Sequence, residues 1–142
     1  MVLNFRAIIT GVVIDLVGSI AGGILVVVLY SAMMTQGNDN ADAVEKILKN
    51  PANSDTLIWM LILVGIFFDG LAGHITAKIA GFLEYWHVLA MLGLLLVVQY
   101  TLRGDSVFAS WVQFVGLTGG TSAAFLMAYR VKRTRRIDPP QD

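Results

Sequence analysis

The chain of 142 residues contains no cysteine, only three prolines and two histidines, and 14% charged residues. Without cysteine it has no disulfide framework, no thiolate nucleophile and no Cys-ligated zinc or iron-sulfur centre. The formal net charge is zero, which argues against a surface that binds nucleic acid. Ordinary soluble domains carry roughly 25% charged residues, so this composition argues against that class.

Motifs of the common enzyme classes are also missing. The sequence has no phosphate-binding loop, no nucleophile elbow and no metalloprotease pattern of paired histidines with a glutamate. It also offers no sizeable extramembrane segment to hold a soluble substrate. We therefore expect a protein that is not an enzyme and that carries no cofactor.

The sequence does contain four apolar segments, at about residues 7–35, 56–77, 85–102 and 107–129. Each is near the roughly 20 residues with which a helix crosses a bilayer. They are too long for strands and do not alternate, so the spanning form is helical. The sequence predicts an all-α membrane protein, a four-transmembrane-helix bundle formed by residues 1–130, followed by a basic tail at residues 131–142.

The distribution of Lys and Arg predicts the orientation. With both termini on one side, that side carries seven of the ten basic residues, namely Arg6, Lys78, Arg130, Lys132, Arg133, Arg135 and Arg136. The positive-inside rule then favours cytoplasmic termini in a multi-pass protein of the cell membrane, which we expect to be a bacterial inner membrane. The five basic residues from Arg130 to Arg136 are a topology anchor, or they contact anionic lipid headgroups.

Small residues recur at every fourth position in two of the segments, and the first segment has a related pattern. The stretch from the second segment into the turn after it has Gly65, Gly73, Ala77 and Gly81, with Asp69 completing the series, and the fourth segment has Gly116, Gly120, Ala124 and Ala128. In the first segment Gly11 precedes Asp15 by four residues, and Gly18 and Gly22 follow. Residues four apart lie nearly above one another on a helix, so such a stripe lets another backbone come close. We expect these helices to pack tightly, and the fourth to be the face for a homo-oligomer or for other membrane subunits.

Two aspartates interrupt the apolar segments at matching depths. Asp15 lies nine residues after Arg6, and Asp69 lies nine residues before Lys78. At 1.5 Å per residue each is about 13 Å from the cytoplasmic boundary, so an antiparallel pair of helices places them at one level. A carboxylate at the bilayer centre costs about 2.5 to 3.5 kcal/mol and usually faces the protein interior or a wet cavity. The pair is therefore a proton or cation relay, or it holds helices together through hydrogen bonds.

The two histidines are the other polar pair. His74 lies about one turn inside Lys78, and His87 opens the third segment, so the two rings are expected at comparable depths. Haem ligation by two histidines is conceivable in such a bundle, but no binding motif surrounds either residue. Hydrogen bonding at the membrane interface is the favoured interpretation, and sensing of pH is a third.

One resemblance is carried by Gly73, Ala77, Lys78 and Ala80 before the turn that follows the second segment. This part of the chain resembles small four-helix bacterial membrane proteins with a small-residue turn containing Lys or Arg, most of which have no assigned function. The resemblance covers about a third of the chain and implies a topology without a reaction. Asp69 and His74 depart from it, because apolar, small or aromatic residues are expected there.

Two functions remain open from the sequence. The first is a helix-packing subunit that self-associates or belongs to a larger membrane complex. The second is a small proton- or cation-linked channel or transporter that uses Asp15 and Asp69. The lipid bilayer is the expected partner in both cases.

Overall fold

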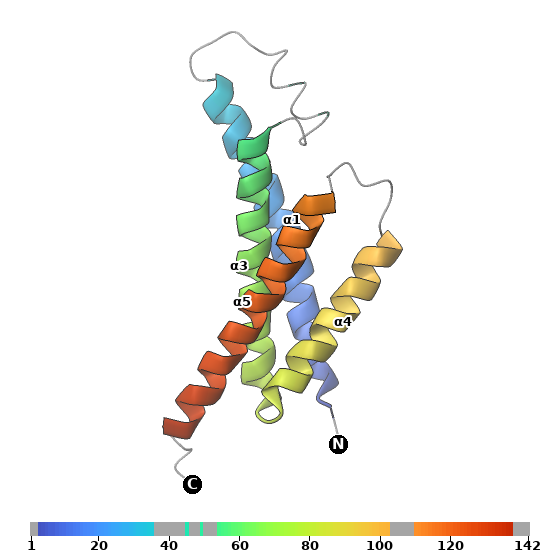
Figure 1. The fold of residues 1–142 in the computed structure, drawn as a ribbon, viewed down its shortest axis with the longest axis vertical. Helices are drawn as coiled ribbons and strands as arrows, with labels where there is room; N and C mark the ends of the chain where they lie inside the picture. Colours follow the sequence, from blue (N-terminus) through green and yellow to red (C-terminus); the bar gives the residue numbers. More distant parts are fainter. Residues whose placement is uncertain (1–2, 36–44, 46–48, 50–53, 103–109, 138–142) are drawn as a thin grey trace.

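The computed structural model describes residues 3–35, 45, 49, 54–102 and 110–137, which contain helices and no strand. The four long helices, labelled as in Figure 1, are α1 (Phe5–Thr35), α3 (Asp55–Ala80), α4 (Glu84–Leu102) and α5 (Ser110–Ile137). The all-helical architecture expected from the sequence is confirmed for this part of the chain.

The helices extend beyond the predicted spans at several ends. The largest difference is at the C-terminal end, where α5 continues through the basic segment to Ile137, about two turns past residue 129. The predicted basic tail therefore begins as helix, because Lys and Arg are good helix formers. The start of the predicted fourth span, residues 107–109, lies outside the described residues.

The helices alternate in direction, so the ends of α1 and α5 nearest the chain termini lie at the same end of the bundle as the turn between α3 and α4 (Figure 1). We call this the terminal end and the opposite one the loop end. The central helix is α3, which makes its most extensive contacts with α5 and with α1. Figure 1 shows α4 leaning away from α1 and α3 toward the loop end.

The turn between α3 and α4 depends on two residues with positive φ. Gly81 ends α3 in the left-handed conformation, with φ at 76°, where glycine has no Cβ to clash. Leu83 follows with φ at 50°, and its carbonyl accepts hydrogen bonds from the amides of Trp86 and His87 in the first turn of α4. Gly81 therefore ends the helix and does not extend the packing stripe that the sequence suggested.

The start of α3 is tied to α1 by Ser54. Its hydroxyl oxygen accepts a hydrogen bond from the Leu57 amide at 3.3 Å, as an N-cap residue does. The same hydroxyl lies 2.8 Å from the hydroxyl of the buried Tyr30 of α1. This contact fixes the register of the two helices at the loop end.

A cluster of buried apolar residues, which we call the core, occupies the terminal half of the bundle. It consists of Ile8, Val12, Ala72, Ala77, Val88, Met91, Leu95, Ala124, Ala128 and Val131. All four helices contribute, α1 through residues that precede Asp15 and α3 through residues that follow Asp69. The two aspartates therefore lie at the boundary between the core and the loop half of the bundle.

Two of the helices, α1 and α3, are long and apolar enough to cross a membrane, with mean hydropathies of 2.6 and 2.0. Within the described residues, α4 and α5 do not meet the same criterion. Only 11% of the most apolar part of α1 is buried, whereas the core helix of a soluble protein is mostly buried. Large apolar side chains are exposed on all four helices, among them Ile24, Phe67, Val97 and Leu126.

Candidate functional site

A cavity of about 970 Å³ lies between all four helices, on the loop side of the core. Its lining comes from within residues 15–23 of α1, 58–69 of α3, 92–100 of α4 and 112–121 of α5. In this half of the bundle α4 leans away from α1 and α3 (Figure 1), and its residues 92–100 line the cavity. Tyr100 lines it and is 78% exposed, so the cavity opens to the surface beside α4.

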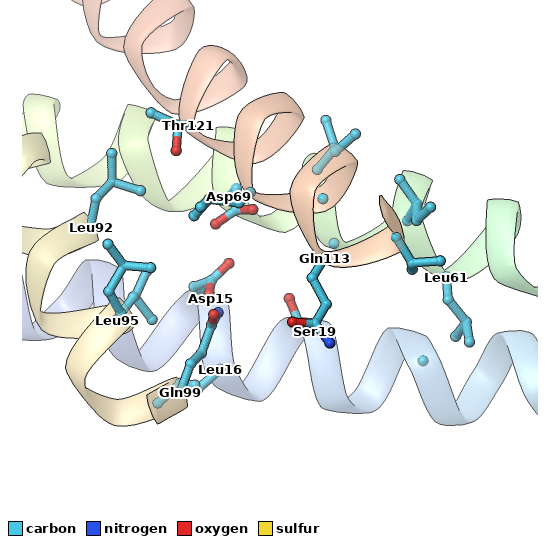
Figure 2. A pocket seen from close by; sticks show the side chains of 18 of the residues that line it. Asp15, Leu16, Ser19, Leu61, Asp69, Leu92, Leu95, Gln99, Gln113 and Thr121 are labelled. Atoms are coloured by element: carbon cyan, nitrogen blue, oxygen red, sulfur yellow. The ribbon is translucent and has the colours of Figure 1, made fainter. Parts of the chain in front are cut away.

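Asp15 of α1 and Asp69 of α3 line the end of this cavity that is nearest the core, and Figure 2 shows their carboxyl groups pointing toward one another. The two side chains interact directly, and Asp15 also interacts with Ser19, one turn along α1. Asp15 is only 4% exposed, and its Oδ1 atom is buried with no hydrogen-bond partner in the described part of the chain. Two facing carboxyl groups avoid repulsion when they share a proton or a cation.

Asp69 can face the cavity because α5 has a glycine opposite it. A Cβ atom added at Gly120 would collide with Oδ2 of Asp69, so the carboxyl group lies directly against the backbone of α5. Any side chain at position 120 would have to displace it. Gly120 therefore makes room for the carboxyl group within this chain.

The cavity wall combines polar groups with an aliphatic lining. Ser19, Gln99, Gln113 and Thr121 supply hydroxyl and amide groups, and most of the other lining residues are aliphatic. Figure 2 shows the amide ends of Gln99 and Gln113 extending toward α1, on the side where Asp15 and Ser19 lie. These hydroxyl and amide groups can bind water inside the cavity.

A packed layer closes the terminal side of the aspartate pair. Thr76 is fully buried, and its hydroxyl can donate a hydrogen bond to the Met91 sulfur at 3.1 Å or to the Ala7 carbonyl at 3.4 Å. A Cβ atom added at Gly11 would collide with the Thr76 hydroxyl and would lie 2.5 Å from the Met91 sulfur. This layer of α1, α3 and α4 separates the aspartates from the terminal end.

The predicted packing residues make close contacts at several positions. Gly18 and Gly22 lie against the Phe68 ring, where an added Cβ would collide at Gly18 and approach to 2.8 Å at Gly22. A Cβ added at Gly73 would lie 2.6 Å from the Ala124 Cα and 2.7 Å from its carbonyl oxygen. Here the backbones of α3 and α5 touch, which only a residue without a side chain allows.

The remaining small residues divide into two groups. Ala77 and Ala124 are fully buried, and the α5 stripe of Gly120 and Ala124 faces α3 within the chain, where the sequence suggested a face for self-association. An added Cβ at Gly65 or Gly116 meets nothing within 4 Å, and both residues line the cavity. The close packing expected there is not seen, because each step of four residues turns the face by about 40°.

The histidines lie in different places. His87 is fully buried; its Nε2 atom accepts a hydrogen bond from the Asn4 amide at 2.8 Å, and its Nδ1 atom lies 3.0 Å from the Leu83 carbonyl. Nδ1 therefore carries the proton, and both ring nitrogens are occupied. His74 instead lines a groove between α3 and α5. Among the described residues, no group of three or more His, Asp or Glu is placed to hold a metal ion.

The predicted lipid-contacting residues lie in the last two turns of α5, as Arg130, Lys132, Arg133, Arg135 and Arg136. The Lys132 Nζ atom lies 4.6 Å from the centre of the Tyr85 ring, in a cation-π contact with α4. Arg130 and Arg133 are exposed. The basic segment is therefore carried on a helix that is anchored to its neighbour.

Sequence reasoning did not single out three polar residues of the cavity. Ser19 follows Asp15 by four residues, and this spacing could have identified it as a neighbour on the same face. Gln99 and Gln113 offered no comparable signal. The sequence does not show which face of α4 or α5 lies toward the other helices, and only the packing of the helices places these two residues on the cavity wall.

Comparison with protein-family models, with curated proteins and with solved structures finds no match to this chain. The geometry of the described residues therefore carries the functional argument.

Proposed function

We propose that the chain is a multi-pass membrane protein in which all four helices cross the bilayer and both termini are cytoplasmic. The apolar and largely exposed surface of α1 supports this, since a bilayer covers such a surface at no cost. Exposed tryptophans lie near both ends of the bundle, with Trp59 and Trp111 at the loop end and Trp86 at the terminal end. Aromatic residues at two levels are typical of the two membrane interfaces.

We further propose that the protein is a small proton- or cation-linked channel or transporter with Asp15 and Asp69 as its binding site. The observation that carries this proposal is the position of the two facing carboxyl groups at the end of a cavity of about 970 Å³, with the buried Asp15 Oδ1 atom unpartnered among the described residues. A purely structural hydrogen-bonding role does not require a cavity in front of the pair.

The depth of the pair strengthens the argument. Asp15 lies ten residues after Phe5, and Asp69 lies eleven residues before Ala80, which places both about 15 Å from the terminal ends of their helices. That depth is close to the centre of a hydrocarbon core about 30 Å thick. Ionisable residues at this depth are costly and usually belong to proton relays or ion pathways.

The two sides of the pair differ in access. On the cavity side, a proton or cation would enter beside α4, where Tyr100 is exposed, and would pass hydroxyl and amide groups that can bind water. Toward the terminal end, the packed layer of Gly11, Thr76 and Met91 blocks the path. Passage across the membrane therefore requires this layer to separate, which favours a transporter that changes conformation over a permanently open channel.

The test is flux into proteoliposomes that contain the parent protein or Asp69→Asn, driven by a pH or cation gradient. We expect the parent to exceed empty vesicles and Asp69→Asn to fall to the level of empty vesicles, because Asn keeps the shape but cannot take up a proton or hold a cation by charge. Asp55→Asn is the matched control, since it removes the same charge from an exposed position on the same helix, outside the cavity. A parent protein without flux refutes transport, and so does equal flux in the parent and Asp69→Asn.

The helix-packing subunit, the first of the two functions left open by the sequence, is the second candidate here, and one observation favours it. Gly93 of α4 is exposed, and a Cβ atom added there meets nothing within 4 Å, so the described residues leave this small-residue position open. A helix of a second copy or of another subunit could pack there and cover the cavity mouth. Native purification in a mild detergent tests this function. A stable complex larger than one chain, together with no flux in vesicles, would support the subunit function and argue against transport.

A further inference from the structure

A second hollow, outside the cavity that holds the aspartates, lies between α3 and α5. This groove has a volume of about 730 Å³ and is lined by Ile66, Phe67, Gly70, Leu71, His74, Lys78, Ala123, Met127, Arg130, Val131 and Thr134. Its floor is the contact of Gly70 with Ala123, where an added Cβ would lie 3.4 Å from the Ala123 Cβ. Glycine and alanine face each other there and fill little space, so the larger side chains beside them on α3 and α5 form the sides of the groove.

The chemistry of the groove changes along its length. The half nearer the centre of the bundle is apolar, with Phe67, Leu71 and Met127. The half nearer the terminal end has His74, Lys78 and Arg130, and the described residues that line the groove include no acidic side chain. One end therefore suits an apolar chain, and the other suits a negative charge.

The length of the groove matches one leaflet of a bilayer. Phe67 and Lys78 are eleven residues apart on α3, which corresponds to about 16 Å along the helix. Half of a hydrocarbon core about 30 Å thick is about 15 Å. With the terminal end at the cytoplasmic surface, the basic side chains lie at headgroup level and the apolar walls lie along the acyl chains.

We propose that this groove binds one anionic phospholipid of the inner leaflet, with the phosphate held by Lys78 and Arg130 and an acyl chain lying against Phe67, Leu71 and Met127. Basic pockets between membrane helices on the cytoplasmic side are suited to anionic headgroups. The proposal rests on the membrane placement proposed above and is independent of transport. A free anion would leave the apolar half unused, and a zwitterionic lipid would gain less from the two cations.

The experiment compares lipid retention by native mass spectrometry after the full chain is reconstituted into vesicles of equal phosphatidylglycerol and phosphatidylcholine. We expect the parent to retain phosphatidylglycerol preferentially. The double variant Lys78→Gln with Arg130→Gln should lose about 25-fold in this preference, since each basic residue near an anionic surface contributes about fivefold. The matched control is Arg6→Gln with Arg133→Gln, which removes equal charge from the same end of the bundle at exposed residues that do not line the groove.

The outcomes separate this proposal from the membrane placement. If the parent does not insert into vesicles, both fail. If the inserted parent retains the two lipids equally, or if both double variants lose phosphatidylglycerol to the same extent, the groove is not a lipid site. Phosphatidylglycerol with six-carbon chains should bind more weakly than the long-chain lipid, and equal binding would leave only an anion site and overturn the proposal.

Discussion

Replacing Gly73 by alanine tests the contact between the backbones of α3 and α5. The new Cβ atom would lie 2.6 Å from the Ala124 Cα, 2.7 Å from its carbonyl oxygen and 2.8 Å from its Cβ. Nonbonded carbon atoms are normally about 3.5 to 4.0 Å apart, so α3 and α5 must separate by about 1 Å. Overpacking of this kind costs about 1 to 3 kcal/mol, which outweighs the 0.5 to 1 kcal/mol that alanine gains over glycine inside a helix.

Gly93→Ala is the matched control for this prediction. It makes the same chemical change in the middle of α4, where the added Cβ meets nothing within 4 Å. We expect Gly73→Ala to lower the melting temperature of the detergent-solubilised protein by about 4 °C for each kcal/mol lost, and Gly93→Ala to leave it unchanged or raise it. Circular dichroism at 222 nm during heating measures both. Equal melting temperatures for the two variants would refute the direct backbone contact between α3 and α5.

Three further predictions concern other parts of the bundle. His87→Phe removes the ring nitrogen that accepts a hydrogen bond from the Asn4 backbone amide at 2.8 Å, and it also removes the ring N–H that faces the Leu83 carbonyl. Hydrogen exchange at the Asn4 backbone amide should therefore accelerate. An unchanged rate would show that the imidazole does not hold the start of α1. Gly81→Ala places a Cβ atom on a residue in the left-handed conformation, with φ at 76°. We expect the free energy of unfolding, measured by denaturant titration, to fall by about 1 kcal/mol. An unchanged value would argue that α3 does not end in this conformation. Cysteines placed at positions 50 and 134 should respond oppositely to an impermeant thiol reagent added to intact cells, and equal labelling would contradict four crossings with cytoplasmic termini.

The helical architecture could be predicted from the sequence, because the long apolar segments are too long for strands and do not alternate. The ends of the helices were harder to place. From its charge, the basic segment after Arg130 is predicted to be a tail. In the structure it continues α5, because Lys and Arg favour the helix. The depth of Asp15 and Asp69 could also be predicted, since 1.5 Å per residue converts sequence distance into position along a helix.

The small-residue stripes show how far such reasoning extends. The sequence indicated close packing at Gly73 and Ala124, where α3 and α5 now touch. The sequence could not indicate that the small residues of α5 pack against α3 of the same chain. A row of small residues allows close approach of any helix and does not specify which one. Gly65 shares the spacing of Gly73 but faces the cavity, since a straight row of four-residue steps winds slowly around the helix.

The sequence by itself determined the helical class, the four apolar segments and the two acidic residues at equal depth, because these depend on composition and on regular rise along each helix. Only the tertiary structure decided that the carboxyl groups of Asp15 and Asp69 face one another at the end of a cavity. The physical reason is that rotation and tilt of helices are set by contacts between residues far apart in the chain. Gly11 against Thr76 and Gly120 against Asp69 are such contacts, and residues of the tilted α4 line the cavity in front of the pair.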